Sequence, residues 1–269
     1  MSWLKLQEIA EMTGGKLHGT DVAIDSVATD SRLVTVDQLF IAIKGERFDA
    51  HDFVADLAGK AGAALVHKKI DCDLPQVVVE DTLQALADLA SEWRKTFKNP
   101  VIGLTGSNGK TTLKEMIAAI LSLEGNVLAT HGNLNNDIGM PLTLLRIRKE
   151  HDFAVIEMGA NHFGEIDFLT NIARPDVAVV NNAGAAHLEG FGNVEGVAKA
   201  KGEIFNGLGT HGVAVINADD KFADYWNDSS KGREVFTFGI SNESIISGRL
   251  LSDGGLMIKA GSNEVRANL

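Results

Sequence analysis

The chain has 269 residues, of which 45% are hydrophobic, which is enough for one large or two ordinary domains. Its formal net charge of −11 argues against nucleic acid or an anionic membrane as the main partner. A single cysteine, Cys72, excludes an intramolecular disulfide framework, and no signal peptide or membrane-spanning apolar run is present, so we expect a soluble cytoplasmic protein without membrane insertion.

The first 80 residues predict a small mixed α/β domain. Apolar spacing indicates a helix near 4–13 and another over 53–61. A longer helix over 82–97 begins at a plausible N-cap, either Asp81 or Thr82. Strands are expected over 22–28, 39–43, 63–67 and 76–80. We place the domain boundary in the long helix, which gives domains of residues 1–82 and 83–269.

From residue 101 onward, apolar runs alternate with helical periods, a pattern typical of a parallel sheet with helices on both faces. The expected strands are 101–104, 127–130, 154–158, 177–181 and 213–217, and the expected helices are near 110–123, 140–149, 164–173 and 194–207. Segments 244–251, 255–260 and 264–269 then resemble short antiparallel strands. The fold class is therefore α/β, with a parallel-sheet domain that carries an antiparallel extension.

The segment 101–112, VIGLTGSNGKTT, predicts a phosphate-binding loop between a buried strand and a helix. Glycines let the backbone approach phosphates, and a helix N-terminus directs free N–H groups at them. Lys110 would contact the β- and γ-phosphates and Thr111 a magnesium ion. A strict Walker pattern requires glycine where Leu104 stands, so the turn depends on the later glycines. The residues expected to bind the nucleotide are Gly106, Ser107, Asn108, Gly109, Lys110, Thr111 and Thr112.

Polar residues follow the next strands at the same edge of the predicted sheet. Glu157 ends one strand and is positioned to reach magnesium or its waters, although it could be an incidental surface carboxylate. Asn181, Asn182 and His187 follow another strand. A lone histidine there is often structural, but the neighbouring strand end of Glu157 favours a functional interpretation of His187.

Two further segments carry residues whose role the pattern leaves open. Lys199 and Lys201 are two apart on a helix, so one faces inward and the other solvent, and the spacing does not choose between them. Asparagines crowd the loop 130–141, where they could bind a ligand or only form turns. They are Asn133, Asn135 and Asn136.

Polar loops flank the expected strand 39–43 of the first domain, at 29–32 and 44–53. Arg32, Lys44 and Arg47 in these loops could receive a diphosphate, because guanidinium and ammonium groups bind phosphate oxygens. Taken alone, the same three residues could equally be ordinary surface charges.

Together these segments resemble the Mur ligases, the ATP-dependent amide ligases of peptidoglycan precursor synthesis. The TGSNGKTT loop at 105–112 is shared across a superfamily that includes folylpolyglutamate synthases. The segments NLNNDIGMP at 133–141 and AKAKGEIF at 198–205 are similar to the branch that adds D-alanyl-D-alanine. The segments at 30–32 and 45–53 are similar to the uridine-nucleotide domain of the family.

The resemblance implies ATP and two magnesium ions as ligands of the central domain. Thr111 and Glu157 would hold magnesium, His187 would support a second ion, and Lys201 matches the lysine that is carbamoylated in the family. Lys110, His187 and Lys201 would be catalytic, and Asn182 would contact the nucleotide. The UDP-sugar and peptide would be bound by Ser31, Arg32, Lys44, Arg47, Asp49, His51, Asn133, Asn135 and Asn136.

The implied reaction joins D-alanyl-D-alanine to UDP-MurNAc-tripeptide through an acyl phosphate, in a protein that we expect to be monomeric. The Rossmann-like third domain of the family is absent from this sequence, and we therefore expect a fragment that is inactive alone. Two alternatives stay open: a sibling ligase with another acceptor, and a nucleotide-binding module without ligase activity. The sequence has no guanine-reading NKxD segment, which counts against a GTPase.

Overall fold

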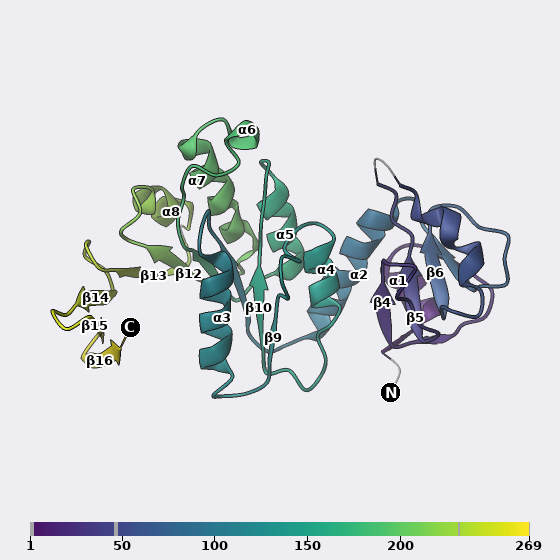
Figure 1. Ribbon diagram of the computed structural model, residues 1–269, viewed down its shortest axis with the longest axis horizontal. Coiled ribbons are helices and arrows are strands. Elements are labelled where there is room, and N and C mark those ends of the chain that lie inside the picture. Colours follow the sequence, from purple (N-terminus) through teal and green to yellow (C-terminus); the bar gives the residue numbers. More distant parts are fainter. Residues whose placement is uncertain (1–2, 46–47, 231, 269) are drawn as a thin grey trace. The chain divides into compact units, whose positions relative to one another are not determined.

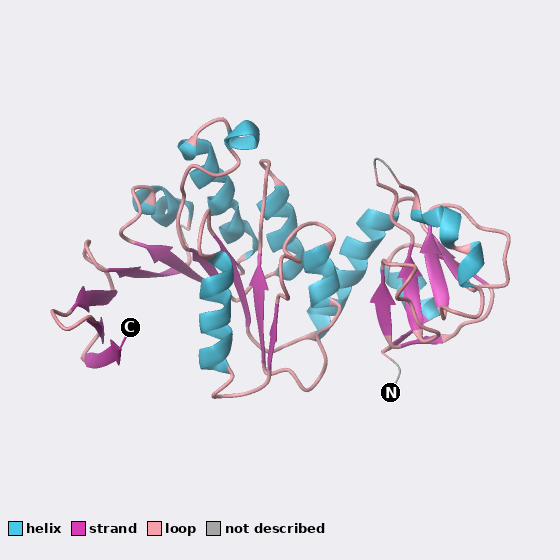
Figure 2. Cartoon of the chain, in the orientation of Figure 1, coloured by secondary structure: helices cyan, strands magenta, loops and turns pink. Residues whose placement is uncertain are grey.

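The computed structural model describes residues 3–45, 48–230 and 232–268. The chain packs into two compact units, one of residues 1–97 with 137–147 and one of residues 98–136 with 148–269. The helix in which we place the domain boundary belongs wholly to the first unit, and the functional division after residue 82 stays a prediction. Figure 2 distinguishes the helices and strands of both units.

The first unit is built on a five-stranded sheet in the order β2-β7-β6-β5-β4, parallel except where β2 meets β7. A separate antiparallel pair joins β1 to β3. The strands are β1 (Leu4–Lys5), β2 (Lys16–His18), β3 (Ala23–Ile24), β4 (Ser26–Ala28), β5 (Gln38–Ile41), β6 (Ala63–Val66) and β7 (Gln76–Val78). The helical elements are α1 (Leu6–Met12), η1 (Ala50–Phe53), η2 (Ala55–Leu57), α2 (Thr82–Thr96) and α4 (Gly139–Leu144).

Two of the expected elements in this unit differ in the structure. The strand expected over 22–28 is divided between β3 and β4, which pair in different sheets. The helix expected over 53–61 is replaced by the two 3-10 turns η1 and η2, and the side chain of Asp49 starts the first of them by accepting from the backbone N–H of His51. Helix α2 forms as expected, with Asp81 as its N-cap through hydrogen bonds from Leu83 N and Gln84 N.

The second unit is a nine-stranded sheet in the order β16-β15-β14-β13-β12-β11-β8-β10-β9. The pairs from β9 to β14 are parallel, whereas β14 with β15 and β15 with β16 pair antiparallel. The strands are β8 (Val101–Thr105), β9 (Val127–Ala129), β10 (Phe153–Glu157), β11 (Val177–Val180), β12 (Val213–Asn217), β13 (Glu234–Gly239), β14 (Ile246–Leu250), β15 (Gly255–Ala260) and β16 (Asn263–Asn268). The α/β class with an antiparallel extension is confirmed, and the yellow strands of Figure 1 form that extension.

The direction of each strand-to-strand crossover decides which face of the sheet its helix covers. They are α3 (Lys110–Leu121), α5 (Glu165–Ala173), α6 (Leu188–Phe191), α7 (Val194–Gly202), η3 (Glu203–Gly207) and α8 (Ala223–Ser229). The β8–α3–β9 crossover runs one way along the sheet, and the crossovers through α5, α7 and α8 run the other way. Because such crossovers are right-handed, α3 covers one face and the other three helices cover the opposite face.

This topology creates a switch point between the neighbouring strands β8 and β11, whose crossovers leave in opposite directions. Open α/β sheets bind ligands in the crevice at the carboxyl ends of such strands. The loops that follow β8 and β11 contain the predicted phosphate loop and the Asn181–Asn182 segment. In the described part of the chain, no helix is long and apolar enough to cross a membrane.

Candidate active site

The phosphate loop, residues 105–112, joins β8 to α3 and has the backbone that an anion-binding turn requires. Gly109 stands at the N-cap of α3 with φ +73°, in the left-handed region that glycine enters without steric cost. A side chain at Gly106 would place its Cβ 3.1 Å from the Cβ of Asn181, so any other residue would push the two loops apart by a few tenths of an ångström. The free N–H groups of the first turn of α3 are therefore available to a ligand at the switch point.

Amide side chains from the loop after β11 hold the phosphate loop in shape. The Asn182 Oδ1 accepts from the backbone N–H groups of Ser107 (3.1 Å) and Asn108 (3.0 Å). The Asn108 carbonyl accepts from the side chains of both Asn181 and Asn182, each at 3.0 Å. Asn182 thus stabilises the loop through its hydrogen bonds. Its contact with a nucleotide stays a prediction.

The first residues of α3 place a cation and a hydroxyl at the mouth of the loop. The Lys110 Nζ folds back and donates to the Gly106 carbonyl at 2.9 Å. The Thr111 Oγ1 donates to the Glu157 Oε2 at 3.0 Å. Thr112 follows in the same turn and is exposed. The loop side of the site therefore offers one positive charge and one hydroxyl oxygen.

Glu157 ends β10 with only 2% of its surface exposed, so its carboxylate depends on hydrogen-bond donors. Besides Thr111, the Asn135 Nδ2 donates to its Oε1 at 2.6 Å. Asn135 is fixed in turn because its carbonyl accepts from the Gly159 N–H at 2.8 Å. The structure thus brings one of the three predicted asparagines to the carboxylate, while Asn133 and Asn136 are exposed in the same loop.

Lys201 on α7 is the inward-facing member of the lysine pair, at 2% exposure, whereas Lys199 is exposed. Among the described residues its Nζ has no hydrogen-bond acceptor, and it lies 5.8 Å from the centre of the Phe191 ring. Burial first, and then the charge of Lys110, lower the pKa of Lys201 to about 8. The ammonium group of Lys110 is thus near enough to that of Lys201 for the two charges to repel each other.

His187 follows β11 in the same loop as Asn182 and is exposed. Its φ of +53° lies in the left-handed region, and only one other described non-glycine residue, Arg174, shares this sign. Such strain is concentrated at functional sites. In the part of the chain that the structure describes, its ring forms no hydrogen bond or ion pair, and its role near a second metal stays a prediction.

The oxygen pair Thr111–Glu157 has the chemistry that magnesium prefers. Among the described residues, no three histidine, cysteine or acidic side chains converge as a metal cage. Magnesium at phosphate sites uses one or two protein oxygens and takes its other ligands from phosphates and water. A hydroxyl can bind the ion through a lone pair while it donates its proton to the carboxylate. The residues present therefore fit a nucleotide-bound magnesium ion.

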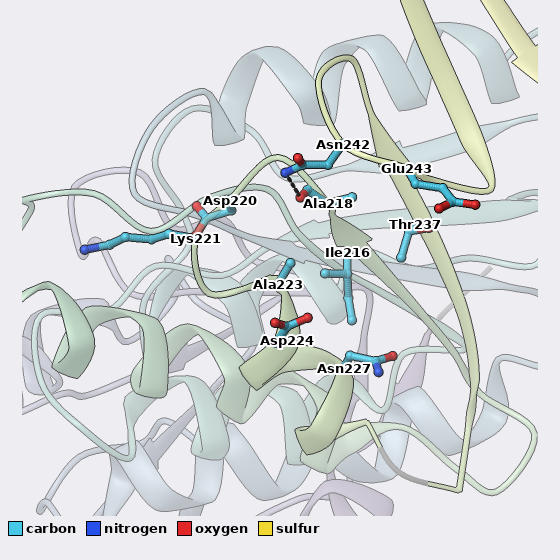
Figure 3. A pocket seen from close by; sticks show the side chains of 10 residues that line it. All are labelled: Ile216, Ala218, Asp220, Lys221, Ala223, Asp224, Asn227, Thr237, Asn242 and Glu243. Atoms are coloured by element: carbon cyan, nitrogen blue, oxygen red, sulfur yellow. Dashed lines mark hydrogen bonds between the residues drawn. The ribbon is translucent and has the colours of Figure 1, made fainter.

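A second cavity, of about 500 Å³, lies beyond the carboxyl ends of β12 and β13 in the same unit (Figure 3). Its lining residues are Ile216, Ala218, Asp220, Lys221, Ala223, Asp224, Asn227, Thr237, Asn242 and Glu243. The Asp220 Oδ2 accepts from the Ala183 N–H at 2.8 Å, which connects the rim of this cavity to the loop after β11. Sequence reasoning missed this cavity because its residues come from three separated segments without a motif.

The first unit contains a cavity of about 510 Å³ at the polar loops singled out in the sequence. It is lined by Thr29, Asp30, Ser31, Arg32, Phe40, Phe48, Ala50 and Phe53. Arg32 is held by Asp30, to which its Nε and Nη2 donate at 2.9 and 2.6 Å. Phe48 and Phe53 stack with ring centres 5.1 Å apart. These two aromatic residues were not among the predicted binding residues. Their position among the charged residues of the loop was the signal that could have identified them.

The remaining predicted residues of this unit shape the loop around the cavity. Lys44 and Asp49 pair as an isolated antiparallel bridge, and Arg47 lies outside the described residues. His51 is buried at 3% exposure and is not among the lining residues. Its Nδ1 lies 2.6 Å from the Asp49 Oδ1, and its Nε2 accepts from the His67 N–H at 2.9 Å. The acceptor role of Nε2 requires the proton of the neutral ring to be on Nδ1.

Comparison with known proteins connects these features. The family model for the Mur ligase middle domain matches residues 104–265, which contain both Thr111 and Glu157. The chain belongs to the Mur ligase family.

Several relatives within this family share a more specific name. The chain is 53% identical over 234 residues to the UDP-N-acetylmuramoyl-tripeptide–D-alanyl-D-alanine ligase of Escherichia coli, covering 87% of this chain and 52% of that protein. It is similar to a crystal structure of MurF from Acinetobacter baumannii, with a TM-score of 0.94, 38% identity, and coverage of 100% of this chain and 61% of that one.

A third relative was solved with a nucleotide. The crystal structure of MurF ligase from Thermotoga maritima in complex with ADP has a TM-score of 0.80 and 34% identity, with 90% of this chain and 57% of that chain covered. The chain spans about half the length of the curated relatives that it matches.

We expect the hydrogen-bonding state of His51 to make the first unit sensitive to acid. Burial is the largest influence on the pKa of His51 and lowers it, aided by His67 and Lys68 and opposed by Asp49. Because the folded-state pKa lies below the unfolded value of about 6.5, the unfolded chain binds the proton more readily. Stability is therefore full above pH 6.5 and falls as the pH decreases from there toward the folded pKa.

Nitrogen-15 NMR of the imidazole checks this expectation. It should find a neutral ring protonated on Nδ1 at pH 7 and a pKa below 6.5, and His51→Gln should flatten the loss of stability between pH 6.5 and 5. A His51 pKa at or above 6.5, or an unchanged acid profile in His51→Gln, would contradict the hydrogen-bond assignment.

Proposed function

We propose that this chain carries the substrate-binding and ATP-binding machinery of a cytoplasmic ligase that joins D-alanyl-D-alanine to UDP-MurNAc-tripeptide. The observation that carries the proposal is the Thr111–Glu157 contact at the mouth of the phosphate loop, with Lys201 buried within the electrostatic influence of Lys110. Relatives that share 53, 45 and 43% identity with this chain are named for that reaction.

The phosphate loop would bind the triphosphate through backbone N–H groups and the N-terminus of α3. Lys110 would exchange its present bond to the Gly106 carbonyl for the phosphates, where its charge offsets that of the transferring phosphoryl group. Thr111 and Glu157 would hold magnesium, which when bound supplies charge neutralisation and orientation of the phosphates. His187 and a modified Lys201 would contribute to a second ion.

The reaction needs no protein nucleophile. The terminal carboxylate of the tripeptide attacks the γ-phosphorus of ATP, the bond to the bridging oxygen breaks, and ADP departs with the electron pair. The amine of D-alanyl-D-alanine then attacks the acyl phosphate, loses a proton and expels inorganic phosphate, which leaves the amide. The role of the chain is to orient the carboxylate and the γ-phosphate and to neutralise charge.

Lys201 is suited to carbamate formation. A neutral lysine amine adds to carbon dioxide and releases one proton, which converts a cation into an anionic oxygen ligand. With a pKa of about 8, about a tenth of the amines would be neutral at pH 7, far more than for an ordinary lysine. The carbamate would also remove the repulsion between Lys201 and Lys110, so local electrostatics favour the modification.

The cavity of the first unit would bind the uridine end of the substrate. Its stacked phenylalanines, Phe48 and Phe53, offer an aromatic surface for a flat base. Arg32 uses part of its five-donor guanidinium on Asp30 and keeps donors for a diphosphate. Lys44, Asp49 and His51 would hold or shape the loop beside it.

The cavity beyond β12 and β13 would hold the nucleoside part of ATP. Its acidic residues Asp220, Asp224 and Glu243 disfavour phosphates, whereas Asn227 and Thr237 offer donors and acceptors for a base and ribose. Sibling ligases with other acceptors would share this arrangement. Substrate-dependent phosphate release, compared across the sibling acceptors with an enzyme of full family length, decides which acceptor is used.

Replacement of Lys110 by alanine should abolish nucleotide binding by the 269-residue chain. The variant loses the one cation of the phosphate loop, while Lys199→Ala removes an exposed lysine on α7 and serves as the matched control. Calorimetric titration with magnesium and ATP should show binding by the wild type and Lys199→Ala only. Wild-type affinity in Lys110→Ala would contradict the assignment of the loop.

A carbamate on Lys201 should be visible by carbon-13 NMR after exchange with labelled bicarbonate. The signal should rise with pH as the amine with a pKa of about 8 becomes neutral, and it should vanish in Lys201→Ala but persist in Lys199→Ala. A signal that survives in Lys201→Ala, or wild-type protein without any signal at pH 8.5 in saturating bicarbonate, would refute the modification.

A further inference from the structure

Lys114 is a buried cation that the proposed reaction does not use. It is the only buried residue of α3 in the described structure, with 1% of its surface exposed. Burial of an ammonium group is costly unless hydrogen bonds and an opposite charge compensate it. A lysine kept at such a position therefore has a structural or functional task.

The contacts of Lys114 lead directly to the candidate magnesium site. Its Nζ donates to the Thr130 carbonyl at 2.6 Å and lies 2.9 Å from the Glu115 carboxylate. Thr130 is itself buried at 1% exposure, and its Oγ1 accepts from the backbone N–H of Glu157 at 2.9 Å. Lys114, Thr130 and Glu157 are thus linked by hydrogen bonds that run from the helix to the backbone of the candidate metal ligand.

This hydrogen-bond chain and the Thr111 contact form a closed ring. Thr111 and Lys114 are three residues apart on α3 and therefore share a helix face. Thr111 binds the side chain of Glu157, and Lys114 reaches its backbone through Thr130. The ring fixes Glu157 at both ends relative to the phosphate loop. It also fixes Thr130, which directly precedes the loop that carries Asn135 to the same carboxylate.

We propose that Lys114 is a positioning residue for the metal site: through Thr130 it sets the position of Glu157 relative to Thr111. This inference rests on the proposed binding of magnesium and ATP. Partners of metal ligands act in this way elsewhere, and their loss costs about 10- to 100-fold in metal affinity. The ammonium group is buried against Thr130 and Glu115, so its loss should weaken the contribution of magnesium and leave the metal-independent binding of ATP in place.

The test is calorimetric titration of the 269-residue chain with ATP, once with magnesium and once with EDTA. The ratio of the two dissociation constants measures the gain from magnesium. Lys114→Met keeps the apolar stem and removes the donor, and it should reduce this gain about 10-fold or more while ATP binding in EDTA changes less than about 2-fold.

Thr130→Val tests the same connection between Lys114 and Glu157 at its second hydrogen bond. It removes the acceptor for the Glu157 N–H but leaves Lys114 its carbonyl partner, so it should also reduce the gain from magnesium, even if Lys114→Met does not fold. Because both variants break one hydrogen-bond chain, the double variant should lose little more than Lys114→Met alone.

Thr170→Val is the matched control for general destabilisation. Thr170 is fully buried on α5 and donates to the Ile204 carbonyl at 2.7 Å, away from this ring. It should lower thermal stability without changing the gain from magnesium. Suppose that the wild type binds magnesium and ATP, and that the gain from magnesium is unchanged in both Thr130→Val and folded Lys114→Met. This result would overturn only the positioning role of Lys114. Wild-type protein that does not bind magnesium and ATP would overturn the proposed function as well.

Discussion

The buried carboxylate of Glu157 is the constraint around which the second unit is arranged. A carboxylate with 2% exposure needs donors, and these come from Thr111 on α3 and Asn135 in the loop after β9. Its backbone N–H donates to the hydroxyl of Thr130, which directly follows β9. One side chain at the end of β10 therefore fixes the relative positions of the phosphate loop, the asparagine-rich loop and two parallel strands.

The electrostatics of the same edge point to anionic ligands. Among the residues that the structure describes, Lys110 has only a carbonyl of its own loop as hydrogen-bond partner, and the buried Lys201 has no acceptor. Burial first, and then the charge of Lys110, lower the pKa of Lys201 to about 8. Phosphate groups at the loop, and a carbamate on Lys201, would both relieve this excess of positive charge. The acidic net charge of the chain is thus compatible with a locally cationic site.

Much of this organisation could be predicted from the sequence, because the signals are local. The glycine-spaced loop ends in Lys110 and Thr111, and the apolar strand that ends in Glu157 places that carboxylate at the same sheet edge. The spacing could not choose between Lys199 and Lys201, because the choice depends on how α7 packs on the sheet, and only the family resemblance singled out Lys201. The pairing of Lys114 with Thr130 likewise joins segments that no spacing rule connects.

The same distinction explains the first unit. The strands and the N-cap of α2 follow from local patterns, whereas the division of residues 22–28 between β3 and β4 depends on pairing with distant strands. His51 was expected to bind substrate because the segment 45–53 resembles the uridine-nucleotide domain of the family. Its burial against Asp49 and His67, which arises only when η1 folds onto β6, gives it a place in the scaffold of the cavity.

A crystal structure of this chain with magnesium and a non-hydrolysable ATP analogue tests the central claim most directly. We expect a metal ion about 2.0–2.1 Å from the Thr111 Oγ1, with the Glu157 carboxylate bound to it directly or through one of its waters, and Lys110 turned from the Gly106 carbonyl to the phosphates. A nucleotide whose phosphates lie away from the phosphate loop, or a metal ion that contacts neither Thr111 nor Glu157, would contradict it.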